Sequence, residues 1–306
     1  MPAPDGVFTT NPNYLDKATA QAIADKTRDY SLITALGTQV PLAPGGTDFP
    51  VYDTSGVQGK FIGEGEQKPT GMASRTNLHM AKRKWALILP FTNEAVRDDK
   101  SGVVQQARNA AAKALARDID KLAFTGAGIA GQSYIDQTTK TQDLSEYGAA
   151  EGSVFQALNG ALRQLVTDGY ELTGWVLDTE IEPVINGAVD AAGRPLFIET
   201  PLVETNPTVR PGRLIGRPAR MARDVASGET PDRILGYAGD FAEVRWGLLS
   251  ALSEDVNTTA TVTLGGQLVS AYEHNLTLFR YEAEVGVLVP DPDAFVKLVD
   301  GAADGS

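Results

Sequence analysis

Six residues near the middle of the chain, Gly126 to Gly131, have the glycine spacing of a dinucleotide-binding loop. The string GAGIAG matches the pattern G-x-G-x-x-G. Dinucleotide binding requires that such a loop join a strand to the start of a helix, where backbone N–H groups meet the pyrophosphate. Here the loop follows a long predicted helix, so it meets the negative end of the helix dipole. We interpret these glycines as a helix stop and a connector.

Other side chains that support catalysis or metal binding are few. The chain has no cysteine and only two histidines, His79 and His274, so disulfides and thiolate metal sites are excluded. Paired acids at predicted helix caps or around prolines are explained by capping or solvation: Asp98/Asp99, Asp118/Asp120 and Asp291/Asp293. The sequence has neither a phosphate-binding loop of the G-x-x-x-x-G-K-[ST] type nor a G-x-S-x-G nucleophile motif. We therefore expect no enzyme activity, no cofactor and no metal ion.

A basic cluster of Lys82, Arg83 and Lys84 lies between His79 and Trp85 and has the composition of a nucleic-acid contact. On a strand, however, such charges also protect an edge from wrong pairing. A contact between subunits explains the charges and the strand together. We predict an inter-subunit contact made by this cluster and by three charged residues of the preceding turn, Glu64, Glu66 and Lys68.

Residues 49–91, which carry these charges, are predicted to form a long β-hairpin. Its outgoing strand begins at Phe49, and its return strand covers 77–91, where the side chains alternate between two faces. The turn at 63–71 is polar and rich in glycine, so it has no core of its own. Because an isolated two-stranded arm is only marginally stable in water, it should rest on its own body or on another subunit.

The strongest helical pattern covers residues 98–125. Apolar side chains recur there at spacings of three and four, and roughly 24 residues would give a rod of about 36 Å. Asp98, Asp99 or Ser101 can cap its start, and Gly126 ends it. The apolar positions are Val104, Ala107, Ala111, Leu115, Ile119 and Leu122.

Helices and strands follow one another without a regular βαβ order, which indicates an α+β fold. A short buried strand is predicted at 175–177 and a long strand at 275–289. After it, Asp293 is expected to cap a last helical turn that ends at Leu298. A second helix is predicted at 153–167. Its expected buried side consists of Phe155, Leu158, Leu162, Leu165 and Val166.

The charge of the chain is unevenly distributed. The net charge of −12 argues against a dedicated nucleic-acid-binding protein. Residues 60–121 contain 12 Lys and Arg against 7 Asp and Glu, a net of +5, whereas the rest has a net of −17. A solvated basic face explains this, and so does a basic segment that lies on an acidic neighbour. No apolar run of about 18 residues occurs, so no membrane-spanning helix is expected.

Short segments along nearly the whole chain resemble the major capsid proteins of tailed bacteriophages, which have the Hong Kong 97-type fold. FIGEGEQKP (61–69) is similar to the tip of the family's extended loop, and LILPFTNE (87–94) to the strand before its spine helix. ALARDIDKLAFTG (114–126) is similar to the end of that helix. The remaining segments resemble the axial domain and the end of the chain: GRPLF (193–197), IGRP (215–218), GDF (239–241), RYEAEVGV (280–287) and PDPDAFVKL (290–298).

This resemblance implies a division of the chain into five parts. They are an N-terminal arm (1–48), an extended β-hairpin loop (49–91), a peripheral domain with the spine helix at about 98–125 (92–150 and 256–300), an axial domain (151–255) and a disordered tail (301–306). The resemblance also implies a structural protein that assembles into hexamers and pentamers of an icosahedral head around double-stranded DNA.

The partners that the resemblance implies are chiefly other copies of this chain. A separate scaffolding protein and a portal are expected, with a decoration protein as an optional addition and no membrane. Packaged DNA should be contacted weakly and without sequence specificity, because each phosphate contact hinders packaging and ejection. The expected location is the virion, after assembly in the host cytoplasm.

Two alternative functions remain open at this stage. An encapsulin-type shell of a cellular compartment has the same fold but holds a protein cargo, so nuclease-protected DNA in native particles discriminates between the two. A dinucleotide-binding enzyme would use the Gly126–Gly131 loop, and protection of that loop by added dinucleotide would favour it.

Overall fold

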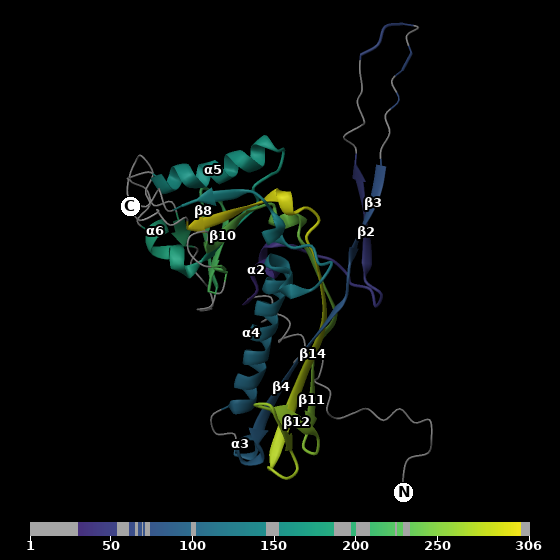
Figure 1. Ribbon diagram of the computed structural model, residues 1–306, viewed down its shortest axis with the longest axis vertical. Coiled ribbons are helices and arrows are strands. Elements are labelled where there is room, and N and C mark those ends of the chain that lie inside the picture. Colours follow the sequence, from purple (N-terminus) through teal and green to yellow (C-terminus); the bar gives the residue numbers. More distant parts are fainter. Residues whose placement is uncertain are drawn as a thin grey trace.

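The chain forms an elongated body from which one hairpin arm projects, as the computed structural model shows (Figure 1). Most of the predicted N-terminal arm and all of the tail 301–306 lie outside the part of the chain that the structure describes. The described residues are 30–53, 61–64, 67–68, 70, 74–98, 102–144, 153–186, 197–199, 209–223, 225–228 and 233–300.

Two sheets form the body, and two short hairpins are attached to it. The first sheet has the order β1 (Thr38–Gln39), β11 (Arg245–Asn257), β14 (Leu276–Leu288) and β4 (Arg83–Thr92). The second sheet has, among the described residues, seven strands in the order β5 (Thr141–Asp143), β15 (Phe295–Asp300), β10 (Arg233–Gly239), β6 (Gly174–Asp178), β9 (Arg217–Ala222), β8 (Val209–Leu214) and β7 (Phe197–Glu199). The hairpins are β2 (Thr47–Asp53) with β3 (Ser74–Met80), and β12 (Thr261–Leu264) with β13 (Gln267–Ser270).

The helices of the described residues vary widely in length. The α-helices are α2 (Leu32–Leu36), α3 (Asn93–Arg97), α4 (Val103–Phe124), α5 (Ser153–Thr167) and α6 (Glu182–Asn186). Single turns of 3₁₀-helix occur at η1 (Gly126–Gly128), η2 (Ile135–Gln137), η4 (Thr179–Ile181), η5 (Phe241–Glu243) and η6 (Pro292–Ala294).

Helix α4 is the predicted long helix, and it lies against the four-stranded sheet (Figure 1). Its start differs from the expected one, because Gly102 occupies the N-cap position without a side-chain cap and Asp98 instead ends α3. Gly126 ends the helix with a positive φ of 68°, and a Cβ there would lie 2.5 Å from Cδ1 of Tyr134. The predicted apolar stripe is confirmed, since Val104 is packed against the core and five further residues are buried: Ala107, Ala111, Leu115, Ile119 and Leu122.

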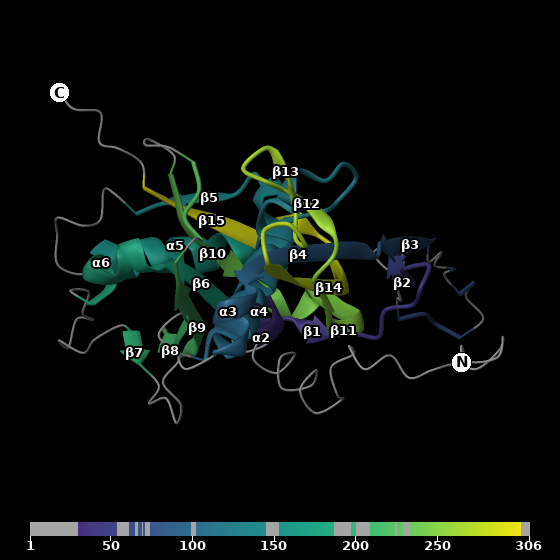
Figure 2. The ribbon, with the colours of Figure 1, turned by 90° about the horizontal axis from the view of Figure 1, so that it is seen from below.

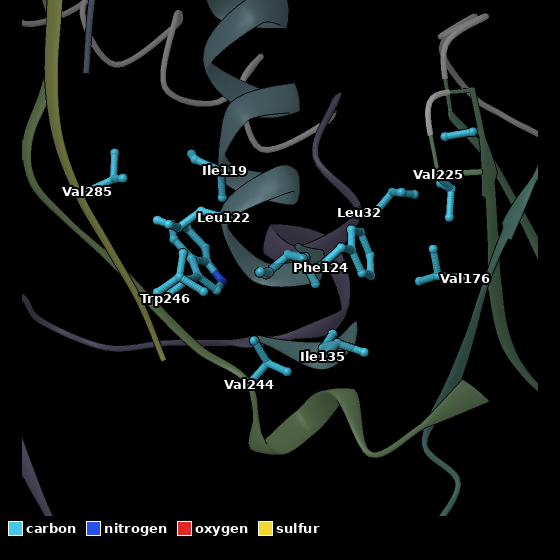
Figure 3. Close-up of a cluster of buried hydrophobic side chains, with 14 of the residues drawn as sticks. Leu32, Ile119, Leu122, Phe124, Ile135, Val176, Val225, Val244, Trp246 and Val285 are labelled. Carbon is cyan, nitrogen blue, oxygen red and sulfur yellow. The ribbon is translucent and has the colours of Figure 1, made fainter. Parts of the chain in front are cut away.

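The largest hydrophobic cluster joins α4 to both sheets. Figure 3 shows Leu122 and Trp246 on one side of Phe124, with Val176 and Val225 on its other side. Trp246 belongs to the four-stranded sheet and Val176 to the seven-stranded sheet. Because the end of α4 fills the space between the two sheets, it fixes their relative position.

The predicted helix at 153–167 matches α5, and the predicted strand at 275–289 matches β14. The expected burial of Val166 is wrong, because its side chain is exposed. Val166 directly follows the buried Leu165, and a step of one residue turns a side chain by about 100° away from the packed face. The side of α5 that packs on the seven-stranded sheet consists of Val154, Ala157, Leu158, Ala161 and Leu165.

The expected hairpin at 49–91 is divided between the arm and the body. Antiparallel pairing joins β2 to β3, from Thr47 opposite Met80 to Asp53 opposite Ser74. Strand β4 has a different partner and pairs along its length with β14. The expectation that one return strand runs from 77 to 91 is therefore wrong. The physical reason is that Trp85, Leu87, Leu89 and Phe91 pack against the core of the body.

The expected helical turn at the end of the chain is also wrong. Asp291 caps a single 3₁₀ turn, accepting from the Asp293 N–H at 2.9 Å, and residues from Phe295 onward form strand β15. Strand β15 lies between β10 and β5, so its side chains are buried on both faces and give no alternating pattern. Residues 295–300 thus belong to the seven-stranded sheet and β11 to the four-stranded sheet, and the division into a peripheral and an axial domain stays a prediction.

Candidate assembly surfaces

The arm formed by β2 and β3 projects from the side of the body opposite to the seven-stranded sheet (Figures 1 and 2). Among the described side chains of these two strands, Met80 alone is buried. Asp48 and His79 stand directly opposite each other, with 2.6 Å between Oδ1 and Nδ1. The described part of the arm is therefore held mainly by backbone pairing and by contacts such as this one.

The turn of the arm carries an aromatic side chain that nothing in the chain covers. Phe61 is fully exposed, at 107% of its reference area. Two of the residues predicted to contact another subunit, Glu64 and Lys68, are described and exposed, whereas Glu66 lies outside the described residues. Exposed aromatic side chains next to charges are typical of protein interfaces.

The base of the arm is attached to the body by a small apolar cluster. Met80 packs with Leu42 and Leu288, and Phe49 packs against this group. The guanidinium carbon of Arg245 lies 4.6 Å from the centre of the Phe49 ring. The base of the arm is therefore anchored on the body, whereas Phe61 farther along the chain is exposed.

The basic cluster Lys82, Arg83 and Lys84 lies at this base rather than on the arm. Lys82 Nζ is 2.8 Å from Glu284 Oε1, and Lys84 Nζ is 3.0 Å from Glu282 Oε1. The two glutamates belong to β14, the strand that pairs with β4. These two lysines therefore have partners inside the chain, and the predicted contact of the cluster with another subunit stays a prediction.

The N-terminal segment is held on α4 by Asp120, one of the acids that the sequence analysis explained by capping or solvation. That interpretation is wrong for Asp120, which lies inside α4 and binds residues 31–33. Asp120 accepts hydrogen bonds from Ser31 Oγ at 2.7 Å and from the N–H groups of Leu32 and Ile33 at 3.0 Å each. Burial beneath these residues raises the pKa of Asp120 to about 6, although the three hydrogen bonds oppose the shift. The available signal was its position between Ala116 and Ala123, which are both buried.

A second exposed apolar feature is the β12–β13 hairpin at the end of the body farthest from the seven-stranded sheet (Figure 1). Leu268 and Tyr272 are exposed at 80% and 78%. The two strands are joined by Gly265 and Gly266, both with positive φ, which suits a two-residue hairpin turn. The Gly-Gly pair was the signal by which this hairpin could have been predicted.

The chemistry considered from the sequence finds little support in the structure. The loop at Gly126–Gly131 follows the C-terminus of α4, as its interpretation as a helix stop requires. Within the described ranges, no three His, Asp or Glu side chains converge on a metal position. No helix of the described ranges combines membrane-spanning length with sufficient apolar character.

A cleft of about 680 Å³ lies where α4 faces strands β8 and β9. Its apolar lining includes Leu32, Phe124 and Val225. Charged residues of both signs line the rest: Lys113, Arg117, Asp120, Lys121, Glu182, Arg210 and Arg223.

A long helix packed on a sheet with a projecting two-stranded arm, and joined to a second sheet, defines the Hong Kong 97-type capsid fold. Residues 13–300 match the phage capsid family. The chain therefore belongs to the phage capsid family, and the predicted resemblance is confirmed.

Two relatives named "probable major capsid protein" agree with this assignment. The protein of Mycobacterium phage L5 is 34% identical over 296 residues, covering 94% of this chain and 89% of the relative. The protein of Mycobacterium phage D29 is 33% identical over 296 residues, covering 95% of this chain and 92% of the relative.

Solved structures share the fold at lower sequence identity. A chain of Mycobacterium phage Ogopogo has a TM-score of 0.69 at 20% identity, with 89% of this chain and 92% of that chain covered. A chain of Gordonia phage Cozz has a TM-score of 0.67 at 19% identity, with coverage of 98% and 92%. A chain described as the capsid of an empty GTA particle has a TM-score of 0.59 at 16% identity, with coverage of 98% and 95%. The predicted α+β capsid fold is confirmed.

Proposed function

We propose that this chain is a major capsid protein that self-assembles into hexamers and pentamers of an icosahedral phage head enclosing double-stranded DNA. The observation that carries the proposal is the arm, whose described residues expose Phe61 and bury only Met80 within the chain. An unsupported two-stranded arm is marginally stable alone, so a neighbouring subunit is the natural surface for it. The role is structural, as a wall of the virion, and requires no catalysis.

The charged residues of the arm and its base extend this proposal to specific contacts. We assign Glu64, Glu66 and Lys68 of the turn, and the cluster Lys82, Arg83 and Lys84, to the boundary between subunits. The two lysines of the base cluster also form ion pairs with β14 of their own chain. In the assembled shell they would contact a neighbouring subunit while β14 holds them in position. Charge complementarity of this kind sets the rate and specificity of association more than its strength.

Other partners belong to the same proposal. A separate scaffolding protein and a portal would take part in assembly in the host cytoplasm, and a decoration protein would bind the finished head. Two relatives that are 34% and 33% identical to this chain come from bacteriophages, which disfavours the encapsulin-type alternative. Native particles decide between the two, because nuclease-protected DNA supports a phage head and a protein cargo supports a cellular compartment.

The direct test of the arm is the substitution Phe61→Ser. The folded monomer should keep its unfolding free energy within about 0.5 kcal/mol, because the side chain is fully exposed. Loss of a buried aromatic anchor at an interface costs about 2 kcal/mol, so the concentration needed for assembly should rise more than tenfold. Particles are counted by negative-stain electron microscopy and light scattering.

The matched control is Val166→Ser, which removes an exposed apolar side chain from α5 on the body. Val166→Ser should raise the concentration needed for assembly much less than Phe61→Ser does. Assembly of the Phe61→Ser protein at the natural concentration would remove the arm from the proposed interface. A purified natural chain that stays monomeric at high concentration would overturn the proposed function itself.

A further inference from the structure

Five cations surround the mouth of the cleft between α4 and the seven-stranded sheet. Three of them come from α4 and recur at every fourth residue. This spacing places them along one face of the helix, about 6 Å apart. The other two come from β8 and from the end of β9. These five residues are Lys113, Arg117, Lys121, Arg210 and Arg223, and we refer to them as the basic rim.

The acids near the basic rim do not neutralise it. Asp120 is enclosed by residues 31–33 and accepts three hydrogen bonds from them. Glu182 forms an ion pair with Arg210, and Arg117 also has an interaction within the chain, so two of the five cations are already engaged. The described lining therefore keeps a net charge of +3 in a chain whose total is −12. Such a local excess in an acidic protein concentrates the positive potential at one place.

The position of the charges indicates the size of the anion. All five residues of the basic rim are exposed to solvent, whereas the apolar residues Leu32, Phe124 and Val225 lie buried at the bottom of the cleft. A small ligand or a peptide that entered the cleft would meet mainly this apolar floor. A polyanion that is too wide to enter would instead meet the cations at the rim.

Duplex DNA has the properties of such a polyanion. It carries one phosphate charge per about 1.7 Å of its axis, and Lys and Arg side chains contact its backbone without reading its sequence. We propose that the basic rim contacts the phosphate backbone of packaged double-stranded DNA, and that this side of α4 faces the interior of the head. The inference rests on the proposed function, because it takes the enclosed polymer to be DNA.

The number of cations sets the expected strength of this contact. With Arg210 shared with Glu182 and Arg117 engaged within the chain, about three phosphates per subunit are neutralised, so the logarithm of the affinity should fall with the logarithm of salt concentration at a slope near −3. A contact of this size is weak for one subunit. It gains effect through repetition across the shell and leaves the DNA free to move during packaging and ejection.

The test uses purified, unassembled protein and a fluorescent duplex of about 30 base pairs. Fluorescence anisotropy is recorded between about 50 and 200 mM salt. The rim variant is Lys121→Gln with Arg223→Gln, one change on each side of the cleft. The control is Arg213→Gln with Arg217→Gln, which removes the same charge from exposed residues of β8 and β9 outside the cleft.

The rim variant should lower the magnitude of the salt slope by about 1.8, which corresponds to two phosphate contacts at about 0.9 each. The control should keep the slope of the natural chain. Equal slopes for the two variants would overturn the assignment of the DNA contact to the rim. Poly-glutamate serves as a second probe, and a rim variant that loses only the peptide would show that an acidic protein segment is the partner instead.

Electron microscopy of the same variants separates this inference from the proposed function. Both variants should fold and assemble, since neither change removes a buried side chain. Normal shells with an unchanged duplex slope would reject the basic rim while leaving the proposed function intact. Failure of the natural chain to form shells would reject the proposed function whatever the DNA measurement shows.

Discussion

The hairpin arm and the seven-stranded sheet contain strands of similar length, but different surroundings stabilise them. Strands β2 and β3 have seven residues each, as does β10, yet every residue of β6 and nearly every residue of β10 is buried. In the arm, Met80 is the one buried side chain among those described. The sheet therefore holds its own core, whereas the arm depends on its base and on whatever covers it.

The proposed function requires a chain that folds by itself and assembles through its arm, and this difference gives a physical basis for both. Two large clusters hold the body together, one of them shared by α4 and both sheets. The arm adds backbone pairing but little apolar burial, and burial is the main favourable contribution to folding. Substitutions in the body should therefore act on folding, and substitutions in the arm should act on assembly.

The largest effect is expected at Trp175 of β6, which is fully buried in the cluster beneath α5. Trp175→Ala should lower the free energy of unfolding by about 3–5 kcal/mol, because a large cavity replaces the indole. Denaturant unfolding followed by circular dichroism measures the loss, with the exposed Val166→Ala as its control. A loss below about 1 kcal/mol would contradict the division between a self-supporting body and a dependent arm.

An intermediate effect is expected where Asp120 joins the N-terminal segment to α4. Its pKa is raised from 3.8 to about 6 in the folded chain, so the folded state binds this proton more tightly than the unfolded state does. The unfolding free energy should consequently fall as pH rises from about 4 to about 6, by on the order of 2–3 kcal/mol.

Asp120→Asn should remove this part of the pH dependence, because an amide does not ionise. Denaturant unfolding of both proteins at several values between pH 4 and pH 7 tests this. The natural chain should lose stability relative to the variant as the pH rises. Parallel pH profiles would show that Asp120 is not the titrating group.

The smallest effect is expected at Phe49, where the arm meets the body. Phe49→Ala should lower the unfolding free energy by about 1 kcal/mol or less, since the ring is partly exposed and its contact with Arg245 is a single cation–π interaction. Amide hydrogen exchange in β2 and β3 should nevertheless become faster. Val51→Ala, at an exposed position of the same strand, serves as the control and should change neither quantity.

The elements that were predicted correctly are those with a clear periodic pattern. Helix α5 has the predicted bounds and β14 nearly so, because α5 packs one face on a core and the large apolar side chains of β14 alternate with other residues over most of its length. Strand β15 was mistaken for a helical turn, since a strand that is buried on both faces shows no alternation. Of the predicted contact residues, Lys82 and Lys84 were found paired within the chain, and their role between subunits remains to be tested.

The α+β class, the long helix with its apolar stripe and the absence of thiol chemistry could be inferred from local spacing and composition, which need no knowledge of distant residues. The family came from the resemblance of short segments in the same order. The pairing of the strands, the end of the arm and the enclosure of particular acids became known only from the folded chain. Those properties depend on contacts such as Asp120 with Ser31, 89 positions apart, which no local pattern records.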